Sequence, residues 1–160
     1  MENVFSHITE DGTVTMVNVN EKTPSHRIAI AESIVYFNEK TFHMLEENAL
    51  PKGDVLTTAK IAGIMAAKQS STLIPMCHPL ALTYIDIRFT KLSSSYSLVL
   101  ESEVHTYGVT GVEIEALVAV QIASITVYDM CKAVQKDIQI GDCKLLYKSG
   151  GKSGEYRYSR

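Results

Sequence analysis

The residues best suited to chemistry in this chain lie on one helical stripe within segment 111–136, which has no proline. The stripe advances by three or four residues at a time and consists of Glu115, Val118, Ile122, Ile125, Asp129 and Lys132. Asp129 and Lys132 can touch on a helix surface, and a solvated salt bridge is the ordinary interpretation of such a pair. Because this pair continues an apolar stripe, we expect it at the rim of a buried interface, where pKa values can be tuned.

Two more candidates, Lys52 and His78, precede this helix. Lys52 stands just before Asp54, which is a good N-cap for a helix running to about Gln69. The helix dipole disfavours a cation there, so either Lys52 shares an anion with the helix start or its side chain points into solvent. Pro79 pushes His78 towards an extended conformation, in a stiff loop that can present the imidazole in a defined direction. Cys77 and His78 do not form a nucleophile–base pair, because adjacent side chains on an extended chain point apart.

The segment KSGGKSG at 148–154 is a candidate phosphate loop. Its GKS triplet matches the end of a Walker motif, but Leu146 stands where the first glycine is required and no helix has room to follow. The sequence therefore excludes a P-loop NTPase. Lys148, Lys152 and the backbone N–H groups between them can still bind phosphate; a flexible tail is the alternative.

Metal binding has weaker support. His78, Cys77, Asp129 and Glu115 are residue types that hold metals, but their spacing matches no standard zinc pattern. We therefore predict no metal site. The chain also lacks the GxSxG, HExxH and GxGxxG motifs.

Composition narrows the function classes. The net charge of −3 argues against a general nucleic-acid coat. Three cysteines without a CxxC spacing predict no disulfide framework, and a reducing cytoplasm. Neither a signal peptide nor a membrane span is expected. The 160 residues fit a single domain, 1–160, with an N-terminal arm (1–15) and a C-terminal tail (149–160) that are flexible unless held by the fold or a partner.

Hydrophobic periodicity predicts the elements that must position these residues. Alternation predicts a strand at 27–37, a hairpin formed by 82–90 and 96–107, and a final strand at 138–148. Thr41 is expected to cap a short helix before Pro51, and the helix that follows Asp54 is rich in small residues that allow close packing. A second stripe on the long helix contains Ala116, Ala119, Val120 and Ala123.

The order strand, helices, hairpin, helix, strand predicts an α+β fold. In such a fold an antiparallel sheet carries the helices on one face. The predicted strands have apolar residues on both sides in places, so the other face must be covered too. A partner subunit is a natural cover.

Six motifs follow one another in this chain: KGD (52–54), AKIAGIMAAK, LIPMCHPL, TGVEIEAL, YDMCKA and KSGGKSG. Together they resemble the MoaC family, the cyclic pyranopterin monophosphate synthases of molybdenum-cofactor biosynthesis, over about residues 16–155. The resemblance implies a ferredoxin-like fold and a cytoplasmic homohexamer, a trimer of dimers, with active sites at subunit interfaces. It implies a lyase without metal or organic cofactor that converts 3',8-cyclo-7,8-dihydro-GTP into cyclic pyranopterin monophosphate and releases pyrophosphate.

The resemblance also implies residue roles. Asp129 and Lys132 would be the central acid–base pair, with Lys52 and His78 adding phosphate binding and proton transfer. A lysine in such a pair can shuttle protons if burial brings its pKa towards neutrality. The residues implied at the pterin end are Met76, Cys77, His78, Ile114 and Glu115. The residues implied around the triphosphate are Arg27, Lys148 and Lys152.

Three departures from the family pattern stand out. Asn18 stands where the family usually has an aspartate, and Ile114 stands where it usually has a methionine. Val109 stands where the family often has a lysine, arginine or glutamine. Asn18 and Val109 bring into question any carry-over to the N-terminal arm and to the loop before TGVE.

Two other function classes compete with the synthase. One is a non-catalytic, ferredoxin-like module that binds a small ligand or RNA, but the scattered tyrosines and acidic chain disfavour it. The other is a metal-dependent phosphohydrolase, which metal analysis of the purified protein would test.

Overall fold

The structure, a computed structural model, describes residues 8–9 and 11–159. Parts of the predicted arm and tail, at 1–7, 10 and 160, lie outside the described residues. In chain order the elements are β1 (Ser25–Tyr36), α1 (Glu39–Glu46), α2 (Val55–Lys68), α3 (Ser70–Leu73), β2 (Leu82–Leu92), a short 3-10 turn (Ser93–Ser95), β3 (Ser97–Gly108), α4 (Glu113–Cys131), β4 (Gln139–Ser149) and β5 (Tyr156–Arg157).

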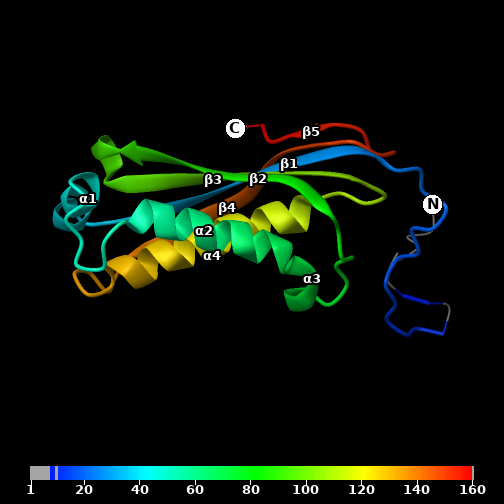
Figure 1. Ribbon diagram of the computed structural model, residues 1–160, viewed down its shortest axis with the longest axis horizontal. Helices are drawn as coiled ribbons and strands as arrows, with labels where there is room; N and C mark the ends of the chain where they lie inside the picture. Colours follow the sequence, from blue (N-terminus) through cyan, green and yellow to red (C-terminus); the bar gives the residue numbers. More distant parts are fainter. Residues whose placement is uncertain (1–7, 10, 160) are drawn as a thin grey trace.

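The strands form one antiparallel sheet in the order β2-β3-β1-β4-β5. β1 is central and pairs with β3 from Ser25↔Gly108 to Tyr36↔Ser97. Figure 1 shows α2 and α4 running side by side beneath one face of this sheet. The predicted α+β class is confirmed, and the order of β1 to β4 in the chain and in the sheet is compatible with the ferredoxin-like arrangement.

Small residues bring the helix layer close to the sheet. On β1 the side chains that face the helices are Ala29, Ala31, Ser33 and Val35, all fully buried. On α4 the buried stripe is the alanine-rich one, and the stripe with Ile125 is the more exposed. By length and composition alone α4 could cross a membrane, but half of it is buried inside the domain, as expected of a core helix.

Gly63 lies where α2 packs closely against α4. A Cβ atom at this position would lie 2.8 Å from the backbone oxygen of Ala119 and 2.0 Å from Cδ1 of Ile87. Only glycine fits without a shift of the helices. The prediction that the small residues of α2 allow close packing is thereby confirmed.

The helix ends test the predicted caps. Asp54 is the N-cap of α2, and its Oδ1 accepts a hydrogen bond of 3.0 Å from the N–H of Thr57. The prediction for Thr41 is wrong. Asn38 caps α1 instead, because its side-chain oxygen accepts from the N–H of Thr41, which is itself buried inside the helix.

α4 and the tail also differ from the prediction. α4 ends at Cys131, where the N–H groups of Val134 and Gln135 turn back onto the Cys131 carbonyl. The glycine-rich tail returns as β5, an unpredicted strand that pairs with β4. The guanidinium of Arg157 lies 4.7 Å from the centre of the Tyr147 ring, which helps to hold this strand.

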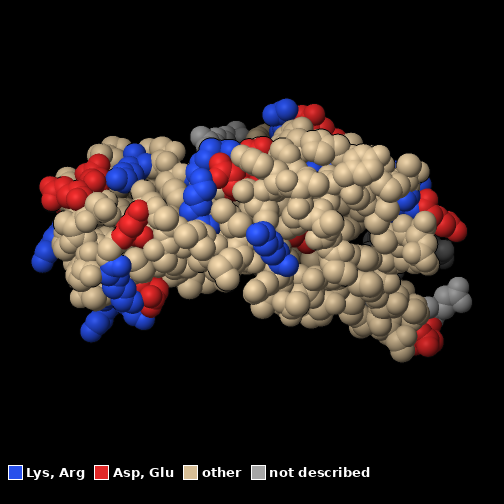
Figure 2. Space-filling view, viewed as in Figure 1, with Lys and Arg blue, Asp and Glu red and all other residues tan. Residues whose placement is uncertain are grey.

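Both outer layers of the domain leave apolar side chains uncovered. On the helix layer, side chains about half exposed are Ile61, Met65, Leu73 and Ile125. Figure 2 shows few charged side chains over the middle and right of this layer, while charges gather at its left end. The isoleucines of β1 on the opposite sheet face, Ile28, Ile30 and Ile34, are only partly buried.

Candidate active site

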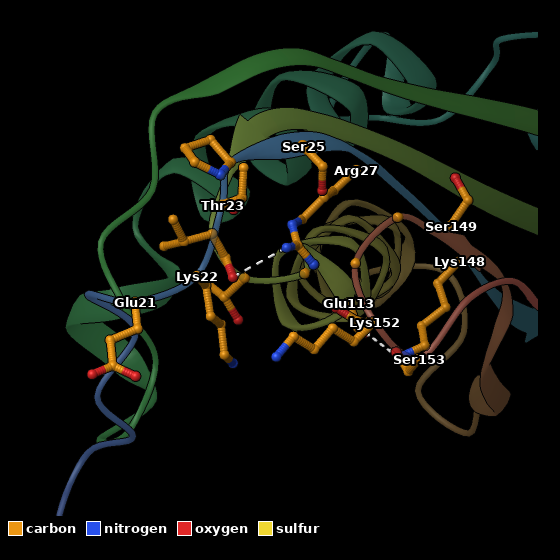
Figure 3. A pocket seen from close by; sticks show the side chains of 16 residues that line it. Glu21, Lys22, Thr23, Ser25, Arg27, Glu113, Lys148, Ser149, Lys152 and Ser153 are labelled. Atoms are coloured by element: carbon orange, nitrogen blue, oxygen red, sulfur yellow. Dashed lines mark hydrogen bonds and ion pairs between the residues drawn. The ribbon is translucent and has the colours of Figure 1, made fainter.

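Two adjoining cavities lie at the N-terminal end of α4. The larger, of about 830 Å³, is bounded by residues 21–27, the loop before α4, the end of β4 and the glycine-rich tail (Figure 3). The smaller, of about 370 Å³, is bounded by the N-terminal arm, the Met76–Leu80 loop and the start of α4. Lys22, Thr110, Gly111 and Glu113 line both cavities, so the two form one continuous depression.

The larger cavity is rich in cationic side chains, and it contains all three residues predicted to bind the triphosphate. The ammonium of Lys148 lies 2.9 Å from Oε1 of Glu113 and 3.4 Å from the hydroxyl of Ser153. Lys152 extends into the cavity from the tail in Figure 3. A polyphosphate is the kind of ligand that this charge favours.

Arg27 fixes two walls of the larger cavity. It is only 9% exposed, and its Nε donates to the carbonyl of Gly108 at 2.8 Å while Nη2 donates to Val109 at 3.2 Å. Gly150 and Gly151 have φ of +97° and +76°, and a Cβ on either would collide with His26 or Arg27. The glycine pair therefore lets the tail lie directly against the guanidinium.

The smaller cavity brings the CHP loop against α4. The thiol of Cys77 donates to Oε1 of Glu115 at 3.3 Å. Burial and this carboxylate raise the pKa of Cys77 to about 12, so the thiol stays protonated at neutral pH. Burial also raises the pKa of Glu115, which is 3% exposed and whose Oε2 has no partner among the described residues. Met76, Cys77 and Ile114 line the cavity, whereas Glu115 lies behind Cys77 and is not among the lining residues.

His78 is tied to the N-terminal arm. Its Nε2 lies 2.8 Å from the carbonyl oxygen of Val17. A carbonyl only accepts hydrogen bonds, so Nε2 carries the proton and Nδ1 holds the free lone pair in the neutral ring. This hydrogen bond selects the tautomer of the neutral ring.

Asp129 lies between two lysines at the other end of α4. Its Oδ1 is 2.6 Å from the ammonium of Lys132, and its Oδ2 is 2.8 Å from that of Lys52. Hydrogen bonds from Lys132 and Lys52 lower the pKa of Asp129 to about 2. Lys52 also donates to the Asp129 carbonyl at 2.9 Å, so it reaches α4 rather than solvent.

The pKa of Lys132 moves opposite to the shift that proton shuttling requires. The hydrogen bond to Asp129 raises it, since the three side chains of this group are 40–50% exposed in the single chain and little desolvation opposes the carboxylate. The pair is not buried within one chain. A pKa nearer neutrality would require a further surface to close over it.

The predicted site residues therefore form two groups rather than one. Arg27, the CHP loop, Glu115 and the tail lysines meet at the N-terminal end of α4, whereas Lys52, Asp129 and Lys132 meet at its C-terminal end. The helical rise separates Glu115 from Asp129 by about 21 Å along the axis. A proton donor must lie within about 3 Å of the atom that it serves, so within one chain the Asp129 group does not serve the two cavities.

Sequence reasoning missed Lys22 and Glu113, the two charged residues that line both cavities. Glu113 lies in the TGVEIEAL motif, next to Ile114. Its position in this motif could have identified it from the sequence. Lys22 stands in a polar stretch with no motif around it, so no pattern indicated it. Among the described residues, no three His, Cys, Asp or Glu side chains gather closely enough to hold a metal ion.

The fold and the site define an α+β protein with a depression whose charge favours a phosphorylated small molecule at one end and whose other end is lined by the CHP loop, behind which the carboxyl group of Glu115 is buried. The model of the MoaC family matches residues 16–151, and the chain belongs to this family. The predicted family resemblance is thereby confirmed.

Several relatives carry the same name, cyclic pyranopterin monophosphate synthase. The protein of Nitratidesulfovibrio vulgaris is 61% identical, over 96% of this chain and 95% of the relative. That of Oleidesulfovibrio alaskensis is 58% identical, over 98% and 99%. That of Staphylococcus carnosus is 52% identical, over 96% of both chains.

Proposed function

We propose that this chain is a cyclic pyranopterin monophosphate synthase of molybdenum-cofactor biosynthesis. It converts 3',8-cyclo-7,8-dihydro-GTP into cyclic pyranopterin monophosphate and releases pyrophosphate. The observation that carries the proposal is the continuity of the two cavities in a chain that shares its family with synthases of this name. One cavity is cationic, and the other is lined by Cys77, whose thiol donates to the buried carboxyl group of Glu115.

The larger cavity binds the triphosphate in this proposal. Lys148 and Lys152 supply ammonium groups, and the guanidinium of Arg27 lies beneath the glycine pair of the tail. Pyrophosphate leaves with additional negative charge, and fixed positive charge around it lowers the barrier. The Lys148–Glu113 ion pair must open or rearrange as the phosphates bind.

The smaller cavity binds the pterin end. Met76 and Ile114 provide apolar contacts, and Cys77 holds one oxygen of Glu115. The other oxygen of Glu115 has no partner among the described residues, but it is fully buried and Glu115 does not line the cavity, so the CHP loop must shift before a guanine-type N–H group reaches it. A buried acceptor without a partner is costly, so a ligand N–H that reaches it gains affinity.

The proton transfers are assigned to Asp129, Lys132, Lys52 and His78. Asp129 is ionised throughout the physiological range because its pKa is held near 2, so it orients the lysines and stabilises their charge. His78 has its Nε2 proton engaged with Val17, which leaves Nδ1 as the basic atom. Their coupling to the bound substrate requires the two groups to meet.

A homo-oligomer brings the two groups together. The Asp129 group of one subunit can complete the cavities of another, as in the hexamer, a trimer of dimers, that the family resemblance implies. Half-exposed apolar side chains on α2, α3 and α4 and the partly buried isoleucines of β1 support such contacts. We also propose a cytoplasmic location, with neither nucleic acid nor membrane as a partner.

The test is pyrophosphate release from the cyclised dihydro-GTP intermediate. We expect release by the native protein, none above background without protein, and loss of release in Asp129→Asn with unchanged folding. Release by both proteins would remove Asp129 from the essential set. A well-folded native protein that releases no pyrophosphate would refute the proposed activity and favour a binding module.

A further inference from the structure

Lys22 lies where the two cavities meet. It is one of the four residues that line both, with Thr110, Gly111 and Glu113. A ligand that fills both cavities must pass these residues at the junction of its pterin and phosphate parts. In a nucleoside triphosphate derivative the sugar joins the base to the phosphates, so the first phosphate past that junction is the α-phosphate.

The arm that carries Lys22 is held against the site. The carbonyl of Val17 accepts from Nε2 of His78 at 2.8 Å. Oδ1 of Asn18 accepts from the N–H of Asn20 at 2.9 Å, and the N–H of Lys22 donates to the carbonyl of Val19 at 3.0 Å. Asn18 thus supports the turn that leads to Lys22, and an aspartate at this position could accept the same hydrogen bond.

The charges around Lys22 are arranged for an anion. Glu113 is paired with Lys148, and neither the Lys22 nor the Lys152 ammonium has a hydrogen bond or ion pair with a described residue. In Figure 3 the Lys22 and Lys152 side chains extend towards each other from the arm and the tail, while Glu21 points away from them. Two ammonium groups that converge on one cavity, neither of them paired with the glutamates that also line it, favour a phosphate between them.

We propose that Lys22 binds the α-phosphate of the substrate, whereas Lys152 binds the β- and γ-phosphates. The identity of the substrate in this inference rests on the proposed function. During cyclisation a hydroxyl oxygen of the sugar-derived part bonds to the α-phosphorus and gives its proton to a base. The bond from phosphorus to the bridging oxygen breaks, and pyrophosphate leaves with the electron pair. An ammonium at the α-phosphate stabilises the charge that develops there.

Binding of GMP and GTP separates the two lysines, because both nucleotides have a guanine and an α-phosphate but only GTP has β- and γ-phosphates. Lys22→Met should weaken both nucleotides by about tenfold, the usual scale for one charge-assisted hydrogen bond. Lys152→Met should weaken GTP alone. The matched control is Lys40→Met, because Lys40 is an exposed lysine on α1 at the far end of the domain. This variant should bind GMP and GTP with unchanged affinity.

The turnover rate tests a second part of the inference, the stabilisation of charge at the α-phosphate during the reaction, which binding affinities do not report. Lys22→Met should lower kcat for pyrophosphate release by about tenfold to a hundredfold, and Lys22→Arg should restore most of it. GMP affinity and kcat in Lys22→Met equal to those of Lys40→Met would overturn the inference. A native protein that binds nucleotides in this pattern without releasing pyrophosphate would refute the proposed function and keep Lys22 as a phosphate ligand.

Discussion

Gly63→Ala tests the packing that positions both ends of α4. The new Cβ would lie 2.8 Å from the Ala119 carbonyl oxygen, a backbone atom that cannot rotate away, and would displace the Ile87 side chain. Overpacking of this kind costs about 1–3 kcal/mol, and alanine recovers up to about 1 kcal/mol of helix propensity. We expect a net loss of about 1–2 kcal/mol in the free energy of unfolding.

Thermal and urea unfolding measure this change at fixed protein concentration. For a domain of this size, the loss corresponds to a Tm about 2–8 °C lower. Gly141→Ala is the matched control, because its Cβ would meet only Tyr36, at 3.5 Å. If Gly63→Ala is as stable as Gly141→Ala, then α2 and α4 are not packed closely enough at Gly63 for an alanine side chain to collide with the backbone of α4.

Three further predictions concern the site. Lys132→Ala should abolish pyrophosphate release while Tm changes little, because Lys132 is half exposed and its removal opens no core cavity; a collapse of Tm would indicate a structural salt bridge. Cys77 should resist iodoacetamide at pH 8 while the exposed Cys143 reacts, as mass spectrometry of the peptides can show, and equal labelling would contradict the raised pKa. The native state binds the Glu115 proton more tightly than the unfolded state, so stability should fall as pH rises from the ordinary carboxyl pKa to the raised one. Glu115→Gln should lack the part of this pH-dependent loss of stability that comes from Glu115. Parallel curves of stability against pH for the native protein and Glu115→Gln would refute the raised pKa of Glu115.

Local chemistry made some elements predictable from the sequence. Asp54 caps α2 because its short side chain accepts a hydrogen bond from a free N–H group in the first turn. This interaction is local and does not depend on where the helix packs. Alternating residues fixed the β2–β3 hairpin for the same local reason. At α1, by contrast, Asn38 and Thr41 are both competent caps, and contacts in the folded chain decide between them. Asn38 is the cap in the folded chain, where its N–H also donates a hydrogen bond to the side chain of Gln135.

Long-range contacts made the remainder unpredictable. β5 forms because the tail pairs with the otherwise unpaired edge of β4. A glycine-rich basic segment has no sequence pattern that predicts this pairing. Family motifs indicated several of the lining residues, yet they could not reveal that Asp129 and Glu115 lie at opposite ends of one helix until the helix bounds were known. Lys22 escaped detection because its role depends only on where the arm crosses the cavities.

The most direct test asks whether the Asp129 group of one subunit serves the cavities of another. Asp129→Asn and His78→Gln subunits, each inactive alone, are mixed by co-expression with different tags and purified through both tags. Random assembly places an intact Asp129 group opposite an intact cavity at about a quarter of the sites. We therefore predict about a quarter of native pyrophosphate release.

The control mixes Asp129→Asn with Lys132→Ala, two changes in the same group, and should recover nothing. Recovery in the first mixture and not in the second is the result that shared sites require. Mixed oligomers that copurify through both tags but release no pyrophosphate would contradict a site built from two copies of this chain.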